Sequence, residues 1–172
     1  MIRPFLIAVA LVAIALTNVC NCHAQSADHV LTLRQYAEAG GLNDAPDGPI
    51  HKLKGNAAFS LTFPRFDVYS PAGDLIYHTT DLNEIRHFLD RFPRSARNLH
   101  TISGTESWSS IASKYHLDNP STPASSVRGR YTFLSLITEE CNACSMERGV
   151  LDEMTSRLAS QGVHQEVLVL SP

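Results

Sequence analysis

The chain has 172 residues, of which 44% are hydrophobic, and a formal net charge of −3 at pH 7. This length and hydrophobic content suffice for one ordinary buried core. The small negative charge gives no electrostatic reason to expect nucleic acid or an anionic membrane surface as a partner. The eight histidines are scattered without the paired spacings typical of zinc sites, so no zinc site is expected.

The N-terminus has the pattern of an export signal. Arg3 supplies a positive charge, residues 5–16 form an unbroken apolar run, and Cys22-His23-Ala24 has the form of a signal peptidase site. The run is shorter than the roughly 20 residues of a membrane-spanning helix. We therefore predict a signal peptide over residues 1–24 and a periplasmic or secreted mature protein. An uncleaved membrane anchor is the alternative.

The predicted cleavage changes the cysteine count. Cys20 and Cys22 would leave with the signal peptide, and the mature chain would keep only Cys141 and Cys144. Thiols of exported proteins meet an oxidising compartment, where they tend to pair. We therefore expect these two cysteines to rest as a disulfide or to cycle through one.

Residues 25–55 are predicted to form an N-terminal extension. One helical candidate runs from Val30 to Ala39. The following residues, 40–49, are rich in glycine, proline, asparagine and aspartate, which indicates a surface loop. We expect a short helix followed by a loop.

A β-hairpin is predicted next. Phe66 to Tyr69 alternates as a strand does, and Leu75 to His78 returns as the second strand. Between them, residues 70–74 contain the proline and glycine of a tight turn.

A helix is predicted directly after the hairpin. Asp81 is placed as its N-cap, and Glu84 three residues later would complete a capping box. Pro93 ends the pattern. The apolar face of this helix consists of Ile85, Phe88, Leu89 and Phe92.

Residues 94–129 are polar and rich in serine, asparagine and proline, which indicates a connecting segment. Within it, Trp108, Ile111 and Tyr115 are spaced as on a short helix, whereas residues 118–126 are typical of a linker.

The C-terminal third is predicted as strand, CxxC motif, helix and strand. Residues 131–137 form an apolar, buried type of strand, and residues 165–170 form the closing strand. The helix between them runs from about Cys144 to Ser160, with Gly162 at its C-terminal cap. A right-handed crossover would make the two strands parallel.

This placement of the cysteines suits thiol–disulfide exchange. The first cysteine lies where the free N–H groups and the positive end of the helix stabilise a thiolate. The second lies in the first turn and can resolve a mixed disulfide. Cys141 is thus predicted as the nucleophile and Cys144 as the resolving thiol. Two alternatives stay open: a structural disulfide, which would close a very small loop, and a Cu(I) site with Met146 as a soft donor.

The strand–CxxC–helix–strand segment resembles the first half of a thioredoxin fold. The stretch from Phe63 to Asp90, with its proline, strand, glycine turn, strand and helix, resembles the second half of that fold. Here the hairpin half precedes the CxxC half. The resemblance implies an α/β fold, a thioredoxin-like mixed sheet flanked by helices, that is circularly permuted. The domain would span residues 56–172, with residues 94–129 as the new connection.

The resemblance also implies a substrate site. The family's cis-proline packs beside the first cysteine, so the resemblance implies that Pro64 is cis and lies near Cys141. The alternative is an ordinary trans proline of an edge strand, since few X–Pro bonds are cis. Phe63 would present its backbone to a substrate, and Asn142 and Ala143 between the cysteines would border it. No cofactor beyond the redox-active cysteine pair is implied.

The chain departs from the family pattern at several positions. Glu140 stands where many members have an aromatic residue, and Ser135 stands where thioredoxins bury an acid that assists proton transfer. Glu139 and Glu140 would also oppose thiolate formation at the neighbouring cysteine. A dedicated exchange partner therefore fits better than a general reductase.

Two functions follow from the sequence. The first is an exported, periplasmic thiol–disulfide oxidoreductase that acts on disulfides or dithiols of envelope proteins, together with an unidentified redox partner. The second is a non-catalytic thioredoxin-like interaction or assembly module of a cell-envelope complex, in which the disulfide is structural.

Overall fold

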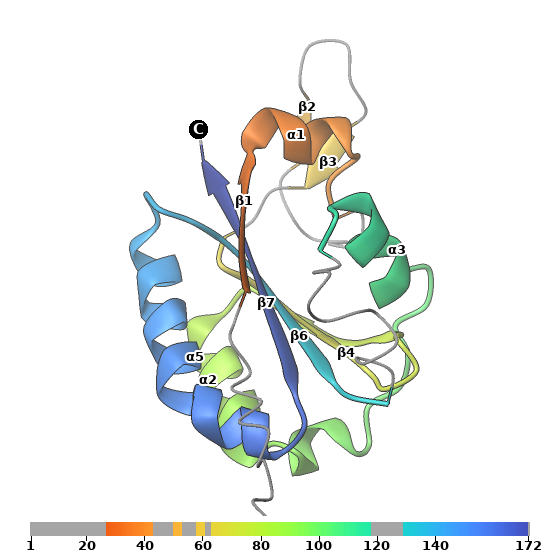
Figure 1. The fold of residues 1–172 in the computed structure, drawn as a ribbon, viewed down its shortest axis with the longest axis vertical. Helices are drawn as coiled ribbons and strands as arrows, with labels where there is room; N and C mark the ends of the chain where they lie inside the picture. The colour runs from red at the N-terminus through yellow and green to blue at the C-terminus, as the bar shows by residue number, and fades with distance from the viewer. Residues whose placement is uncertain (1–26, 43–49, 53–57, 61–62, 118–128, 172) are drawn as a thin grey trace, which may run out of the picture.

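Five strands from separate parts of the chain form one mixed sheet (Figure 1). The computed structural model describes residues 27–42, 50–52, 58–60, 63–117 and 129–171. Strands β1 and β6 both run parallel to β7, whereas β4 is antiparallel to its neighbours β6 and β5. Across the sheet, the order of the strands is β1 (Ala27–Thr32), β7 (His164–Ser171), β6 (Thr132–Thr138), β4 (Arg65–Tyr69) and β5 (Leu75–Thr79).

The predicted strands of the C-terminal third are confirmed. β6 and β7 are parallel, as the crossover predicted, and nearly every residue along both is buried. Such burial on both faces explains why the two segments are apolar runs without alternation. The helix between them, α5 (Asn142–Ser160), begins two residues earlier than expected, and Gly162 after it has a positive φ of 73°.

The predicted hairpin and the helix after it are also confirmed. Gly73 in the turn has φ of 93°, a conformation that glycine adopts without steric cost. Helix α2 (Leu82–Arg91) follows with Asp81 as its N-cap, since the Asp81 carboxylate accepts hydrogen bonds from the backbone N–H groups of Asn83 and Glu84.

The expected capping box at α2 is wrong in one respect. The Glu84 carboxylate accepts a hydrogen bond from the Thr79 hydroxyl rather than from the backbone N–H of Asp81. That N–H donates instead to the Thr79 hydroxyl. Thr79 ends β5, so its hydroxyl links the strand to the helix and takes the place of a direct box.

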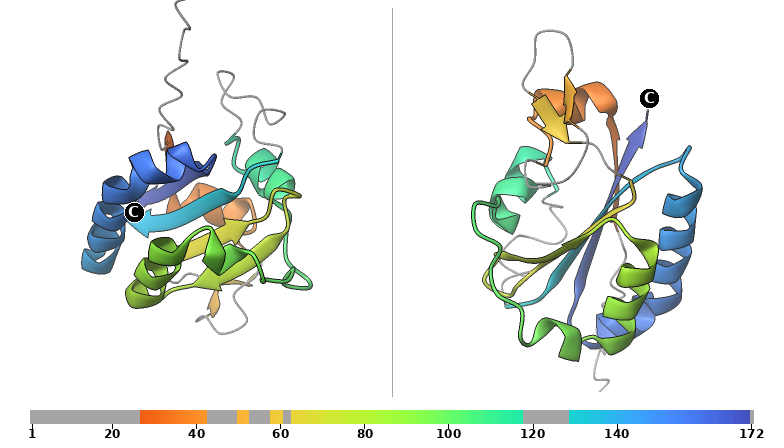
Figure 2. Two further views of the ribbon diagram at one scale, coloured as in Figure 1. Left: turned by 90° about the horizontal axis from the view of Figure 1, so that it is seen from below. Right: turned by 180° about the vertical axis from the view of Figure 1, so that it is seen from behind.

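Helices cover both faces of the sheet, as Figure 2 shows. Helices α2 and α5 lie on one face, and α1 (Leu33–Glu38) and α3 (Trp108–Lys114) lie on the other. Aromatic rings dominate the core under α2 and α5, where Phe66, Phe88, Phe92 and Phe133 contact one another. The α/β fold class is therefore established, and it is compatible with a thioredoxin-like fold.

The N-terminal segment differs from the expectation of a helix from Val30 to Ala39. Residues 27–32 instead form β1, which pairs in parallel with β7 along its full length. The helix begins only at Leu33, because the Thr32 hydroxyl accepts from the backbone N–H of Gln35, and the Gln35 side-chain oxygen accepts from the backbone N–H of Thr32. The N-terminal segment thus contains an edge strand of the main sheet, followed by a short helix.

The connecting segment contains the predicted short helix. α3 is capped by Ser107, and the backbone N–H of Trp108 donates to the Gly73 carbonyl in the hairpin turn. A 3-10 turn (Arg94–Ala96) follows α2. Strands β2 (Ile50–Lys52) and β3 (Ala58–Ser60) form a separate antiparallel pair.

Several predicted segments lie outside the described residues. They are the signal peptide at residues 1–24, most of the loop at residues 40–49 and the linker at residues 118–126. Among the described helices, none combines the length and the apolar character that crossing a bilayer requires.

The cap of α2 can be tested by substitution. Asp81→Ala removes the acceptor for two backbone N–H groups and should lower the free energy of unfolding by about 1 kcal/mol. Asp90→Ala, which removes an exposed carboxylate in the last turn of the same helix, is the control and should not lower the free energy of unfolding, because a negative charge is unfavourable at that end of a helix. Urea denaturation of both variants measures the difference, and equal midpoints would contradict the assigned cap.

Candidate functional site

The CxxC motif joins strand β6 to helix α5. After β6 ends at Thr138, the backbone N–H of Cys141 donates to the Thr138 carbonyl and closes a tight turn. Cys141 is the N-cap of α5, and its own carbonyl accepts the first helical hydrogen bond, from Ser145. The motif is therefore held at the end of a central strand, at the start of a helix of 19 residues.

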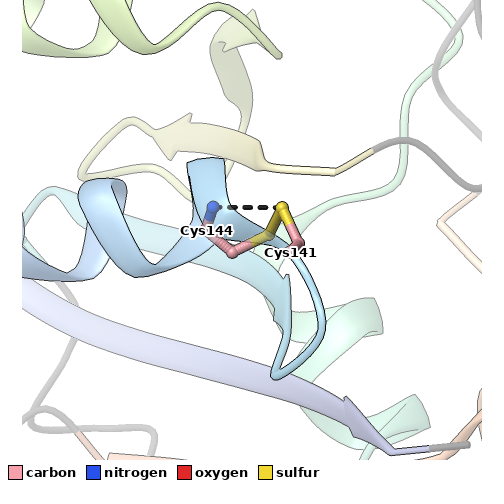
Figure 3. The surroundings of a disulfide bond; sticks show 2 residues. All are labelled: Cys141 and Cys144. Atoms are coloured by element: carbon pink, nitrogen blue, oxygen red, sulfur yellow. Dashed lines mark hydrogen bonds between the residues drawn. A yellow bond between two sulfur atoms is a disulfide. The ribbon is translucent and has the colours of Figure 1, made fainter.

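The two cysteines form a disulfide (Figure 3). Their Cα atoms are 5.1 Å apart. The backbone N–H of Cys144 donates a hydrogen bond of 3.0 Å to the Cys141 sulfur. The sulfur thus occupies the position that a serine or aspartate oxygen takes in an ordinary N-cap.

The two sulfurs differ in their access to solvent. Cys141 is partly exposed, whereas Cys144 is only 1% exposed. Cys144 packs among Ile137, Val167 and Val169, which come from the two parallel strands beneath the helix. An external thiol can therefore approach Cys141 and not Cys144.

The electrostatic setting favours a thiolate at Cys141. The free N–H groups and the positive end of a helix stabilise negative charge within its first turn. The N–H of Cys144 already points at the Cys141 sulfur. Glu139 and Glu140 are exposed, so solvent screens their opposing charges.

The proline segment lies close to the same apolar cluster. Phe63-Pro64 is a cis peptide, as the resemblance implied, and Pro64 is buried. Phe63 and Cys141 both pack, partly buried, against the cluster that holds Cys144. The expected packing of Pro64 against Cys141 itself stays a prediction.

The residues between the cysteines have different exposures. Asn142 is exposed and Ala143 is partly buried. Both lie in the first turn of α5, beside the half-exposed sulfur of Cys141. Their assignment as substrate-contacting residues, like that of Phe63 and Pro64, stays a prediction.

Glu147 is a buried acid that the sequence analysis missed. It lies on α5 three residues after Cys144, and it is 0% exposed. Burial raises the pKa of its carboxyl from the usual 4.5 to about 8, while the Ser135 hydroxyl lowers it and the charge of Asp67 adds to the rise. Neither carboxyl oxygen has a well-formed hydrogen bond among the described residues. The contact with Ser135 therefore offsets only a small part of the rise in pKa that burial causes.

The sequence contains a signal for Glu147. Cys144, Val150, Leu151 and Leu158 form the buried face of α5, and position 147 falls on that face three residues from Cys144 and three from Val150. A single charged residue on an otherwise apolar face indicates a buried acid. The spacing of apolar residues alone does not indicate it, because that pattern contains only hydrophobic positions.

A buried ion pair follows the cis-proline directly. Arg65 and Asp67 on β4 are 3% and 0% exposed, and their side chains lie 2.8 Å apart. Asp67 also contacts the His78 ring at 2.6 Å, and Arg65 donates to the Leu42 carbonyl at 3.3 Å. Burial is the largest influence on the pKa of Arg65 and lowers it, but the charge and hydrogen bond of Asp67 together with Tyr36 and Tyr69 outweigh burial, so the pKa is raised. Through the hydrogen bond from Arg65 to Leu42, the pair links the start of β4 to the residues that follow α1.

No group of three or more histidine, cysteine or acidic side chains with the geometry of a metal site occurs among the described residues. The chain matches no protein-family model, no curated protein and no solved structure. The assignment of function therefore depends on the site itself.

The raised pKa of Glu147 predicts a pH-dependent stability. Between about pH 4.5 and pH 8, the folded protein holds a proton on Glu147 that the unfolded chain has lost. The contribution of this proton to the free energy of unfolding is therefore complete below pH 4.5 and is lost as pH rises through 8. Each pKa unit corresponds to about 1.4 kcal/mol. Relative to Glu147→Gln, the wild type should therefore lose about 2–5 kcal/mol of unfolding free energy between pH 5 and 9.

Chemical denaturation at several pH values measures this loss. Glu153→Gln removes an exposed carboxylate from the same helix and should keep the wild-type pH dependence. If Glu147→Gln and the wild type lose stability in parallel as pH rises, the carboxyl does not titrate as described.

Proposed function

We propose that the protein is an exported thiol–disulfide oxidoreductase in which Cys141 is the nucleophile and Cys144 the resolving thiol. The observation that carries the proposal is the asymmetry of the two sulfurs at a helix N-terminus. Cys141 is reachable and accepts an N–H hydrogen bond, whereas Cys144 is buried in the first turn. Nucleophilic and resolving thiols need this difference in access.

We also propose that the fold is thioredoxin-like, with the hairpin half before the CxxC half. The hairpin β4–β5 and helix α2 lie within residues 56–93, and β6, the cysteines, α5 and β7 lie within residues 130–171. The neighbouring order β7-β6-β4-β5, with one parallel and two antiparallel pairings, supports this arrangement.

The proposed reaction is exchange between this pair and a protein disulfide. In the reduced protein, the Cys141 thiolate attacks one sulfur of the substrate disulfide, and a mixed disulfide forms as the first substrate thiolate leaves. The Cys144 thiolate then attacks the Cys141 sulfur, the mixed disulfide breaks, and the second substrate thiolate leaves. A substrate dithiol drives the same steps in reverse and is oxidised while the pair is reduced.

The substrate is proposed to be an envelope protein with thiols or a disulfide. Phe63, Pro64, Asn142 and Ala143 would border its peptide, and an unidentified redox partner would restore the starting state of the pair. Export to the periplasm follows from the signal pattern of residues 1–24. In the alternative function, an interaction module, the disulfide would be structural.

Substitution of each cysteine separates the two functions. Cys141→Ser should abolish reduction of insulin disulfides, because the reachable nucleophile is lost. Cys144→Ser should keep the nucleophile but not the resolving step, so mixed disulfides should accumulate on Cys141. Non-reducing electrophoresis and mass spectrometry of the exported variants detect these adducts.

The control is Ser145→Ala, an exposed hydroxyl beside the motif, which should behave like the wild type. Absence of adducts on Cys144→Ser, combined with unchanged biological activity of Cys141→Ser, would contradict the oxidoreductase and favour the interaction module.

A further inference from the structure

We propose that Glu147 exchanges the proton of the Cys144 thiol when the disulfide opens and closes. This inference deepens the proposed function and rests on it. The observation behind it is that a buried carboxyl without a well-formed hydrogen bond stands one helical turn from the buried sulfur.

The position of Glu147 follows from the helix. Cys144 and Glu147 are three residues apart on α5, so their side chains are neighbours on one face of the helix. Both are buried, at 1% and 0% exposure, so both face the sheet. On β6, Phe133 packs under α5 and Ile137 packs with Cys144, and Ser135 between them therefore faces the same helix. The carboxyl thus interacts with the Ser135 hydroxyl and lies on the same buried face of α5 as the resolving cysteine, one helical turn away.

Among the described residues, no positive charge is placed to neutralise a carboxylate at Glu147. Asp67 on β4 lies on the opposite face of the sheet, since its neighbours Phe66 and Val68 pack under α2 and α5. It is occupied by Arg65 and His78. On the face toward α5, β7 presents Val167 and Val169, and α2 buries the apolar Ile85, Phe88 and Leu89.

The nearest cation along the helix points elsewhere. Arg148 forms an ion pair of 2.8 Å with Asp28 on β1 and a longer one with Asp152. Glu139 and Glu140 before the motif are exposed. The Glu147 carboxyl is therefore held neutral at neutral pH, with its pKa raised to about 8, and it is poised to give up a proton to a stronger base nearby.

The disulfide produces such a base when it opens. An external thiolate attacks the Cys141 sulfur, the bond between the two cysteines breaks, and the electron pair leaves on the Cys144 sulfur. That sulfur is cut off from water, so its negative charge is costly there. The Glu147 carboxyl donates its proton to the Cys144 thiolate, which becomes a thiol, and Glu147 becomes a carboxylate.

The closing step runs in reverse. The Glu147 carboxylate takes the proton from the Cys144 thiol, and the resulting thiolate attacks Cys141 in the mixed disulfide. The substrate leaves as a thiolate, and Glu147 is neutral again. A buried acid with a purely structural role would change stability with pH but would not change the rate of either step.

The rate of opening by dithiothreitol tests the inference. The oxidised wild type is mixed with dithiothreitol from pH 6 to 10, and the rate is divided by the concentration of dithiothreitol thiolate. The normalised rate should be constant up to about pH 8 and fall above it, as Glu147 ionises. In Glu147→Gln it should be at least about tenfold lower below pH 8 and show no break.

Two further variants serve as controls. Glu153→Gln should follow the wild-type profile, because that carboxylate is exposed on the same helix. Glu147→Asp keeps a carboxyl and should keep a break, with a smaller rate because its side chain is shorter. If Glu147→Gln does not fold, the wild-type break and its retention in Glu147→Asp decide the question.

The outcomes separate the inference from the proposed function. A wild-type pair that exchanges rapidly, with no break near pH 8 or with the same profile in Glu147→Gln, overturns the role of Glu147 and leaves the oxidoreductase in place. A wild-type pair that dithiothreitol does not open in the folded protein overturns both.

Discussion

The hydrogen bond from the Cys144 backbone N–H to the Cys141 sulfur positions the rest of the site. It makes Cys141 the N-cap of α5, and so it fixes where the helix begins relative to the end of β6. Because α5 starts there, its third and sixth residues turn toward the sheet and are buried. One residue is the second cysteine, and the other is Glu147. The reachable sulfur, the buried sulfur and the buried acid thus all follow from one capping position.

The local parts of this arrangement could be predicted from the sequence. These parts depend on residues that are neighbours in the sequence, so local patterns are enough to predict them. They are the hairpin from Phe66 to His78, the Asp81 cap and the two apolar strands around the motif. The cis bond at Pro64 came from the resemblance rather than from local preference, since few X–Pro bonds are cis.

The parts that could not be predicted depend on distant contacts. Residues 30–32 begin the modest helical pattern expected from Val30 to Ala39, yet residues 27–32 form β1 because β7, more than 130 residues later, offers a free edge. Thr79 takes the hydrogen bonds expected between Asp81 and Glu84 because the end of β5 lies beside the helix. The burial of Glu147 depends on the sheet beneath α5, where the Ser135 hydroxyl on β6 interacts with its carboxyl. A pattern within one segment contains none of this information.

The buried polar groups are costly for stability and concentrate around the site. Glu147 lies beside the cysteines, and the Arg65–Asp67 pair follows Pro64 directly. Removing a carboxyl from water without good hydrogen bonds is unfavourable, and a buried ion pair often stabilises less than apolar residues of the same size. Glu147 and the Arg65–Asp67 pair lie on the CxxC segment and the proline segment, which border the proposed substrate site. A role in the reaction explains these buried groups better than a contribution to packing does.

The reduction potential of the Cys141–Cys144 pair shows whether this disulfide is a redox centre or a structural bond. The mature protein would be equilibrated in glutathione buffers, alkylated and analysed by mass spectrometry for free thiols. An exchange protein should have a potential between roughly −270 and −120 mV, the range of known exchange catalysts. A potential well below about −300 mV would mean that glutathione does not readily open the disulfide, and it would contradict the assignment of the pair as a redox centre.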